Sequence, residues 1–259
     1  MKKWVKFLLS IIFVISFILL YSRFISTRGF NVLEYSIVDS KLPNNFNGLK
    51  IVHFSDIHYG RTTNINTIKN VVNEINVLKP DIVIFTGDLY ENNLNILDKE
   101  AKNIIKELKK VNTKLGKFAI TGDSDKKDYK NIMVEAGFTL IDNDSTYVYQ
   151  NGITPIKITN NFENIEDVFT IALMHEPDQI DNINLENINV ALAGHSLNGQ
   201  IRIPFYGGII KRTGAKKYID SSYKVNNTQL FISNGLGTED ISFRLFNKPS
   251  ISLYRLTNY

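Results

Sequence analysis

The hydrophobic positions in the first half of the chain alternate between short apolar runs and amphipathic segments. Residues 49–54, 81–86 and 117–120 are apolar runs of strand length. Between them, apolar residues within 65–78 and 97–111 recur at the three- and four-residue spacing of a helix, and Pro80 closes the first of these segments. Alternation of strand and helix predicts right-handed crossovers and a largely parallel sheet covered by helices.

The pattern changes after a short helix predicted at 129–136. Short apolar runs then predominate, and the last of them alternates apolar and polar residues. These runs predict a second, more strand-rich sheet. With an earlier strand at 32–38, they favour one layered α/β domain beyond about residue 30. The later strands are expected at 140–141, 146–149, 153–158, 169–174, 189–193, 230–233 and 251–256.

The N-terminal segment has the composition of a membrane helix. Residues 7–21 are apolar except for two serines, and flanking apolar residues bring the run to the ~20 residues that span a bilayer. A signal peptide would look similar, but no small-residue cleavage site follows. We therefore expect residues 1–28 to form an uncleaved anchor and linker, and residues 29–259 to form the domain. Three lysines before the run predict a single-pass protein of the cell membrane with its N-terminus inside and its domain on the outer face, although two following arginines weaken this asymmetry.

Composition narrows the chemistry further. With no cysteine in 259 residues, disulfides, thiolate metal sites and cysteine nucleophiles are excluded. The net charge of +4 favours anionic partners, such as phosphorylated small molecules or acidic lipid surfaces, and no nucleic-acid partner is expected.

Asp56 and His58 follow the predicted strand at 49–54. In an extended segment, residues i and i+2 point to the same side, so we expect these two side chains to converge just beyond the strand. A carboxylate and an imidazole that converge suit a divalent transition metal. An Asp-x-His triplet by itself is more often an ordinary surface feature, and the other strands decide between the two interpretations.

Acids and histidines follow four further predicted strands in the same way. Open α/β sheets gather their ligands at the carboxyl ends of strands, so these residues jointly favour a metal site over separate structural roles. They are Asp88, Asp123, Asp125, His175 and His195. The remaining histidine, His53, lies within a predicted strand, and we expect it to be a buried structural residue.

The motifs around these residues form an ordered series that resembles the calcineurin-like metallophosphoesterases. The resemblance is to their membrane-anchored or secreted bacterial branch, which includes phosphodiesterases and UDP-diacylglucosamine pyrophosphatases, and it extends from about residue 42 to the end. The motifs are Ser55-Asp56-Ile57-His58, Thr86-Gly87-Asp88, Thr121-Gly122-Asp123-Ser124-Asp125, Met174-His175-Glu176-Pro177-Asp178 and Gly194-His195-Ser196-Leu197-Asn198-Gly199-Gln200.

This resemblance implies a four-layer sandwich of two mixed β-sheets flanked by helices, preceded here by the transmembrane helix. It also implies hydrolysis by a metal-activated hydroxide held between two ions. Carried over by position, the first ion would be held by Asp56 and His58, and Asp88 would bridge both ions. The second ion would be completed by Asp123, His175 and His195.

The sequence departs from the family motifs at three positions. Asp123 replaces a family asparagine and adds a negative charge that attracts a cation. Ser124 replaces a histidine thought to protonate the leaving group, a contribution worth roughly 10²–10⁴-fold. Asp125 is a candidate to replace part of that function, which makes Asp88 and Asp125 the candidate catalytic residues. Leu197 replaces a histidine ligand, so the first ion would have fewer ligands than the second.

Two functions therefore stay open. One is a metal-dependent phosphoesterase that hydrolyses a phosphodiester or pyrophosphate bond of a lipid-linked or nucleotide substrate, with one or two Mn, Zn or Fe ions per chain. The other is a catalytically degenerate protein of the same fold that binds a phosphorylated ligand or partner at the membrane. Ligands kept only as remnants form a third, weaker alternative, because drift would not preserve all the other ligand types.

Overall fold

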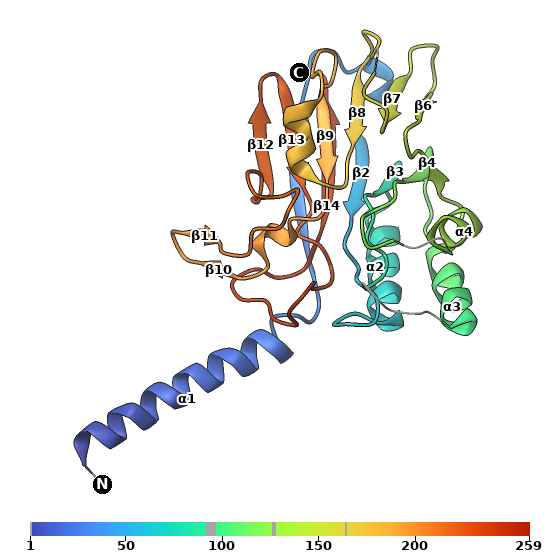
Figure 1. The fold of residues 1–259 in the computed structure, drawn as a ribbon. Helices are drawn as coiled ribbons and strands as arrows, with labels where there is room; N and C mark the ends of the chain where they lie inside the picture. The colour runs from blue at the N-terminus through green and yellow to red at the C-terminus, as the bar shows by residue number, and fades with distance from the viewer. Residues whose placement is uncertain (1, 92–96, 126–127, 164) are drawn as a thin grey trace.

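The structure is a computed structural model that describes residues 2–91, 97–125, 128–163 and 165–259. Helix α1 (Lys3–Phe24) projects away from the body of the molecule, and nearly all of its apolar side chains are exposed (Figure 1). Its 22 residues correspond to about 33 Å, the thickness of a bilayer's hydrocarbon core. Within the described residues it is the one helix long and apolar enough to cross a membrane.

The first sheet has six strands, five from residues 31–140 and one from the C-terminal end of the chain. Its neighbouring strands are parallel except for the antiparallel pair of β14 with β2. Its order is β1 (Asn31–Val38), β14 (Ser250–Thr257), β2 (Leu49–Phe54), β3 (Ile82–Phe85), β4 (Gly116–Ala119) and β5 (Thr139–Leu140).

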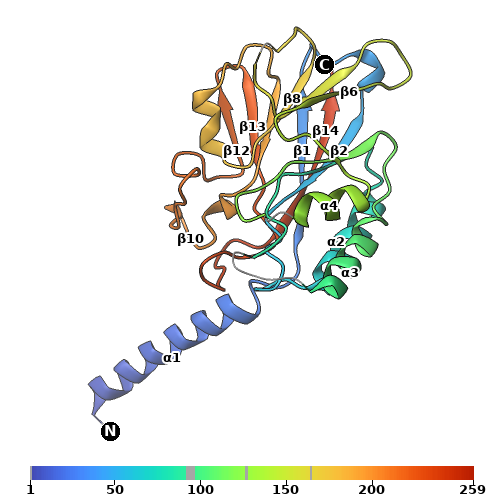
Figure 2. The same ribbon diagram turned by 45° about the vertical axis from the view of Figure 1, so that its right-hand side comes forward.

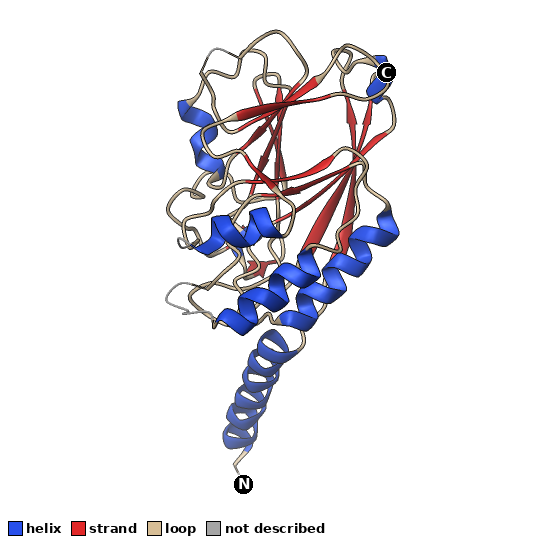
Figure 3. Ribbon diagram, turned by 90° about the vertical axis from the view of Figure 1, so that its right-hand side faces the viewer, coloured by secondary structure: helices blue, strands red, loops and turns tan. Residues whose placement is uncertain are grey.

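Three helices cover the outer face of this sheet: α2 (Ile65–Leu78), α3 (Asp98–Leu108) and α4 (Asp128–Glu135) (Figure 3). Helix α2 begins where the Asn64 side chain accepts hydrogen bonds from the N–H groups of Asn66 and Thr67. It ends at Lys79, whose backbone is left-handed with φ of 50°, immediately before Pro80. These signals explain why the predicted helix boundaries match the structure here.

The second sheet also has six strands. Its central strands are parallel, and the edge strands β12 and β6 pair antiparallel with their neighbours. Its order is β12 (Ser222–Val225), β13 (Thr228–Ile232), β9 (Val190–Ala193), β8 (Thr170–Leu173), β7 (Ile156–Thr159) and β6 (Ser145–Val148). The short helix η2 (Pro177–Asn182) packs on its outer face through Ile180. The remaining short elements are η1 (Asn44–Phe46), η3 (Leu197–Gly199) and the hairpin of β10 (Arg202–Ile203) with β11 (Gly207–Gly208).

The two sheets face one another across a buried apolar core (Figure 2). Ile51 and Ile84 of the first sheet belong to the same cluster as Leu192 and Phe231 of the second. This packing confirms the predicted α/β sandwich of two mixed sheets with helices outside.

Two features differ from the expectation. Strand β14 is not part of the second sheet but lies inside the first, between β1 and β2. Its alternating polar residues Ser250 and Ser252 are nevertheless buried, because both faces of the strand are covered. Ile251 and Leu253 pack in the core beneath the helices, and Tyr254 and Leu256 pack in the core between the sheets. Strand β12 and the hairpin were not predicted, because they are short and contain few consecutive apolar residues.

Candidate metal centre

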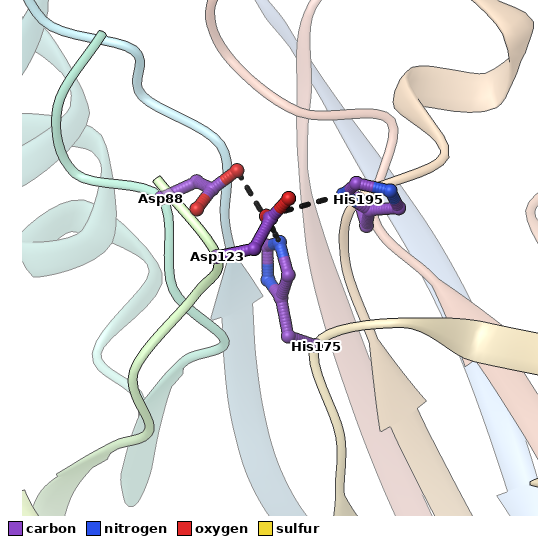
Figure 4. Close-up of side chains that lie close together, drawn as sticks. All are labelled: Asp88, Asp123, His175 and His195. Carbon is purple, nitrogen blue, oxygen red and sulfur yellow. Dashed lines mark hydrogen bonds and ion pairs between the residues drawn. The ribbon is translucent and has the colours of Figure 1, made fainter. Parts of the chain in front are cut away.

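The loops that follow strands of both sheets bring four predicted ligands together. Figure 4 shows Asp88, Asp123, His175 and His195 directed toward a common point. His175 Nε2 lies 2.8 Å from Asp123 Oδ1 and 3.2 Å from Asp88 Oδ2, and His195 Nδ1 lies 3.4 Å from Asp123 Oδ1. Such a set of two carboxylates and two imidazoles is suited to a divalent transition metal.

A second group lies beside the first and shares Asp88 with it. It consists of Asp56, His58 and Asp88, all fully buried. His58 Nε2 lies 3.9 Å from Asp56 Oδ1 and 3.7 Å from Asp88 Oδ2. Two adjacent groups of potential ligands with one carboxylate in common have the arrangement of a two-metal site.

Asp56 and His58 converge for a different reason from the one expected. Strand β2 ends at Phe54, and both residues adopt left-handed backbone conformations, with φ of 50° and 45°. The turn after the strand, and not an extended backbone, therefore directs the two side chains to one point. Asp88 and His195 are also left-handed, with φ of 62° and 64°. A non-glycine residue in this region carries strain, which concentrates at functional sites in proteins.

Backbone carbonyls fix the tautomers of two histidines. His175 Nδ1 lies 2.6 Å from the carbonyl oxygen of Thr86, and His195 Nε2 lies 2.7 Å from that of Thr213. Because a carbonyl only accepts hydrogen bonds, these nitrogens carry the hydrogens. The other nitrogen of each ring, which faces the carboxylates, is thereby left available for a metal.

The electrostatics of the cluster favour a cation. Burial by itself lowers the pKa of His175, but the charge of Asp88 and the hydrogen bond to Asp123 raise that pKa well above its usual value. Burial likewise raises the pKa of Asp123, yet its hydrogen bond with His175 and its interaction with the nearby His195 hold that pKa well below the ordinary range. The negative charge of the carboxylates therefore favours protonated imidazoles. A bound metal ion would supply the same compensating positive charge at these positions.

Several buried polar atoms of the cluster have no hydrogen-bond partner. They are both ring nitrogens of His58, Oδ2 of Asp88 and Nδ1 of His195. An unpaired buried polar atom is costly, by about 1–3 kcal/mol for a neutral group. All of these residues belong to the two groups, so one or two divalent ions would satisfy the unpaired atoms. The residues present therefore fit the metals that the sequence implied.

Comparison with known proteins agrees with this geometry. The family model described as Calcineurin-like phosphoesterase matches residues 49–205. The chain belongs to the calcineurin-like phosphoesterase family. The metallophosphoesterase YkuE of Bacillus subtilis is 30% identical, over 91% of this chain and 88% of its own length. The metallophosphoesterase Cj0846 of Campylobacter jejuni is 27% identical, over 98% of this chain and 72% of its own length.

A further relative is named as a transmembrane protein. The transmembrane protein with metallophosphoesterase domain of Danio rerio is 34% identical over 42% of this chain and 24% of its own length. The family predicted from the motifs is thus confirmed, and the candidate span of α1 agrees with a membrane-associated member of the family.

At the two positions where family histidines are replaced, the side chains are buried. Ser124 donates its hydroxyl hydrogen to the carbonyl oxygen of Tyr90 at 3.0 Å, and its N–H donates to Asp88 Oδ1 at 2.9 Å. Leu197 is fully buried. A Cβ atom placed on Gly235 would lie 2.2 Å from Leu197 Cδ2 and 3.0 Å from Asp56 Cβ, so the leucine side chain lies close to Asp56. Hydrocarbon therefore packs near Asp56 where the family motif has an imidazole.

Asp125 lies behind the cluster, with both carboxylate oxygens bound to the backbone. Its Oδ2 accepts from the N–H groups of Asp88 and Gly122, each at 2.9 Å, and its Oδ1 accepts from that of Leu89 at 2.8 Å. Burial and the charge of Asp88 raise the pKa of Asp125 to about 7, against the effect of these hydrogen bonds. The geometry favours a role in joining the two ligand loops, and proton donation by Asp125 stays a prediction.

Two residues near the centre were not predicted. Glu91 Oε2 lies 3.9 Å from His58 Nδ1, and its other oxygen pairs with Arg61. Arg244, fully buried, donates to the carbonyl oxygens of Asn234 and Gly237 at 2.7 to 2.9 Å. Glu91 follows Asp88 by only three residues, and this closeness in the sequence could have identified it as a residue near the candidate metal centre. Nothing local in the sequence indicated that Arg244 would be buried.

Proposed function

We propose that this protein is a membrane-anchored, metal-dependent phosphoesterase that hydrolyses a phosphodiester or pyrophosphate bond. The observation that carries the proposal is the position of Asp88, whose buried carboxylate belongs to both groups of potential ligands. Family membership supports hydrolysis of phosphoester bonds, and the buried unpaired nitrogens and oxygens support bound metal.

The residues divide unequally between the two metal positions. Asp88, Asp123, His175 and His195 would hold one divalent ion, and Asp56 and His58 would hold a second together with Asp88. When bound, such ions act as Lewis acids toward a phosphoryl oxygen and acidify a water molecule. We propose one or two Mn, Zn or Fe ions per chain, with the four-ligand position filled first.

The chain's own residues orient the ligands and leave one side open. The carbonyls of Thr86 and Thr213 hold the two imidazoles, and Asp125 joins the loops of Asp88 and Gly122. The side chain of Asp123 is 47% exposed, unlike the other ligands, which are buried. Substrate therefore approaches from the side of Asp123.

The replacement of the family histidine by Ser124 limits the class of substrates that can be hydrolysed. Ser124 has a hydroxyl that is far too weak an acid to protonate a leaving group near neutral pH. Substrates whose leaving group needs little protonation, such as a pyrophosphate, are therefore favoured. We infer a lipid-linked or nucleotide substrate on the outer face of the membrane, in line with the lysines that precede α1 and the basic net charge.

The second candidate is a binding protein that retains the fold but has lost turnover. Leu197 favours it, because this buried side chain offers no ligand near Asp56, and so does Ser124, whose hydroxyl is bonded to the carbonyl of Tyr90. In this case the four-ligand position would recognise a phosphoryl group without hydrolysing it.

One experiment separates the two. The full chain, purified in detergent without chelator, would be assayed for bound metal and for hydrolysis of bis(p-nitrophenyl) phosphate and of a nucleoside diphosphate ester. We expect bound metal and turnover that an Asp88→Ala substitution abolishes. Metal with no turnover on either substrate would favour the binding protein. Protein that takes up no Mn, Zn or Fe would refute both.

A further inference from the structure

The hairpin of β10 and β11 ends in an exposed apolar cluster. Phe205 at its tip is fully exposed, Tyr206 is 76% exposed, and Phe246 from a neighbouring loop is 66% exposed. Phe205, Tyr206 and Phe246 line one surface depression, together with Ile203 of the same hairpin. Single exposed apolar residues are ordinary on soluble domains, but several aromatic residues gathered at one place mark a surface that contacts something apolar.

The hairpin holds these side chains outward in a defined conformation. The N–H of Tyr206 donates to the carbonyl of Ile203 at 3.1 Å, and Phe205 between them has a left-handed backbone with φ of 66°. The base of the hairpin is packed tightly, since a Cβ on Gly199 would lie 2.5 Å from the Cα of Gly208. The aromatic tip is thus a built feature of the fold and not a loosely attached loop.

A continuous path of backbone hydrogen bonds connects the hairpin to α1. The N–H of Arg244 donates to the carbonyl of Ser22, in the last turn of α1, at 3.0 Å. The carbonyl of the next residue, Leu245, accepts from the N–H of Arg202, the first residue of β10, at 2.9 Å. In two views of the molecule the hairpin lies on the side of the domain from which α1 projects (Figures 1 and 2). The cluster is therefore held where α1 would leave a bilayer.

Basic side chains accompany the apolar ones. Lys248 is exposed two residues after Phe246, and its side chain lies beside Gly29, shortly after the end of α1. Lys211 is exposed just after β11. Aromatic residues with nearby lysines are typical of the membrane–water interface, where rings lie among the headgroups and ammonium groups pair with lipid phosphates.

We propose that the apolar tip of the β10–β11 hairpin, together with Phe246, inserts into the headgroup region of the bilayer that α1 spans. The domain would then be bound to the membrane at two points, the anchor and the hairpin, which fixes its orientation on the surface. The hairpin packs through Gly208 on Gly199, four residues from His195, so this contact would also hold the metal centre near the lipid headgroups. The proposal depends on insertion of α1 but not on catalysis.

The test uses the full chain in liposomes of phosphatidylcholine and phosphatidylglycerol, with and without lipids brominated in the upper part of the acyl chain. The single native tryptophan, Trp4, is first replaced by phenylalanine. Phe205→Trp then reports on the hairpin. Ile153→Trp is the matched control, because Ile153 is 94% exposed in the β6–β7 loop, at the end of the domain remote from α1 (Figure 1).

We expect the Phe205→Trp protein to show blue-shifted emission and clear quenching by brominated lipid, because an interfacial side chain lies about 5–10 Å into the boundary between headgroups and acyl chains. The Ile153→Trp protein should show neither effect. Equal emission and quenching in the two proteins would overturn the proposal. Quenching of Trp4 in the unsubstituted protein reports insertion of α1 separately. If Trp4 is not quenched, the anchor premise fails, and the two-point attachment fails with it.

Discussion

His175 Nε2 lies 3.2 Å from Asp88 Oδ2, although the two residues follow strands of different sheets. Asp88 follows β3 of the first sheet and His175 follows β8 of the second. The candidate metal centre is therefore assembled across the sandwich, and each sheet alone supplies only some of its potential ligands. Any change that shifts one sheet relative to the other alters the ligand distances directly.

The two metal positions should differ in affinity. Four potential ligands define one and three the other, so we expect His195→Ala to remove the tightly bound ion and His58→Ala to remove only a weaker one. Metal content measured after dialysis against a series of free metal concentrations would show this order. His53→Gln is the matched control, since His53 is equally buried but lies outside both groups, and it should bind metal as the unsubstituted protein does. Equal loss of bound metal in the two alanine variants would contradict the predicted difference in affinity.

Restoring the two family histidines should raise turnover. In a Ser124→His, Leu197→His double variant, an imidazole is again available as a general acid and another as a ligand near Asp56. We expect kcat to rise by about 10²-fold or more, the usual contribution of general acid catalysis. Leu197→Met is the control, because it keeps a side chain of similar volume without a strong ligand, and its kcat should stay at the original level. A double variant as slow as its parent, yet with two bound ions, would show that other residues limit the reaction.

Asp125→Asn distinguishes a positioning residue from a proton donor. The carboxylate accepts three backbone N–H groups, and an amide offers only one oxygen, so at least one donor loses its partner. We expect the free energy of unfolding to fall by about 2–4 kcal/mol and metal affinity to weaken. The exposed Asp98, changed to Asn, should have little effect on either. An Asp125→Asn protein with unchanged stability and metal affinity but no turnover would instead identify Asp125 as the acid.

His53 should make stability depend on pH. As the sequence indicated, it is fully buried; its ring nitrogens lie 2.8 Å from Thr86 Oγ1 and 3.3 Å from the Tyr254 hydroxyl. Burial lowers the pKa of His53 to about 3, from an ordinary value of 6.5. Between pH 7 and pH 5 the unfolded chain therefore takes up a proton that the folded protein does not, and this lowers the free energy of unfolding by about 2 kcal/mol.

Denaturant unfolding of the full chain in detergent at pH 7 and pH 5 checks this contribution. The His53→Gln variant keeps a polar side chain facing Thr86 but has no group that titrates there. Its loss of stability between the two pH values should be smaller than that of the unsubstituted protein by the same amount. Identical losses of stability in the two proteins would mean that the folded protein binds a proton at His53 as readily as the unfolded chain does.

Most of the fold was predictable because its signals are local. The periodicity of residues 65–78 and the closing Pro80 define α2, and the apolar runs before Asp56, Asp88 and His195 define β2, β3 and β9. The family and its candidate ligands follow from motifs of three to seven residues. Such patterns are visible in a single sequence because each reflects the chemistry of neighbouring residues.

The kind of elements, their order and the residue types at the strand ends therefore follow from local patterns in the chain. Which strands pair depends on the tertiary structure, since β14 inserts between β1 and β2 through contacts about 200 residues or more apart along the chain. The tertiary structure also determines that Asp56 and His58 meet through a left-handed turn, that Arg244 is buried against the 234–237 loop, and that an aromatic hairpin lies on the side of the domain from which α1 projects. These features depend on packing between distant segments, which leaves no periodic or local trace in the chain.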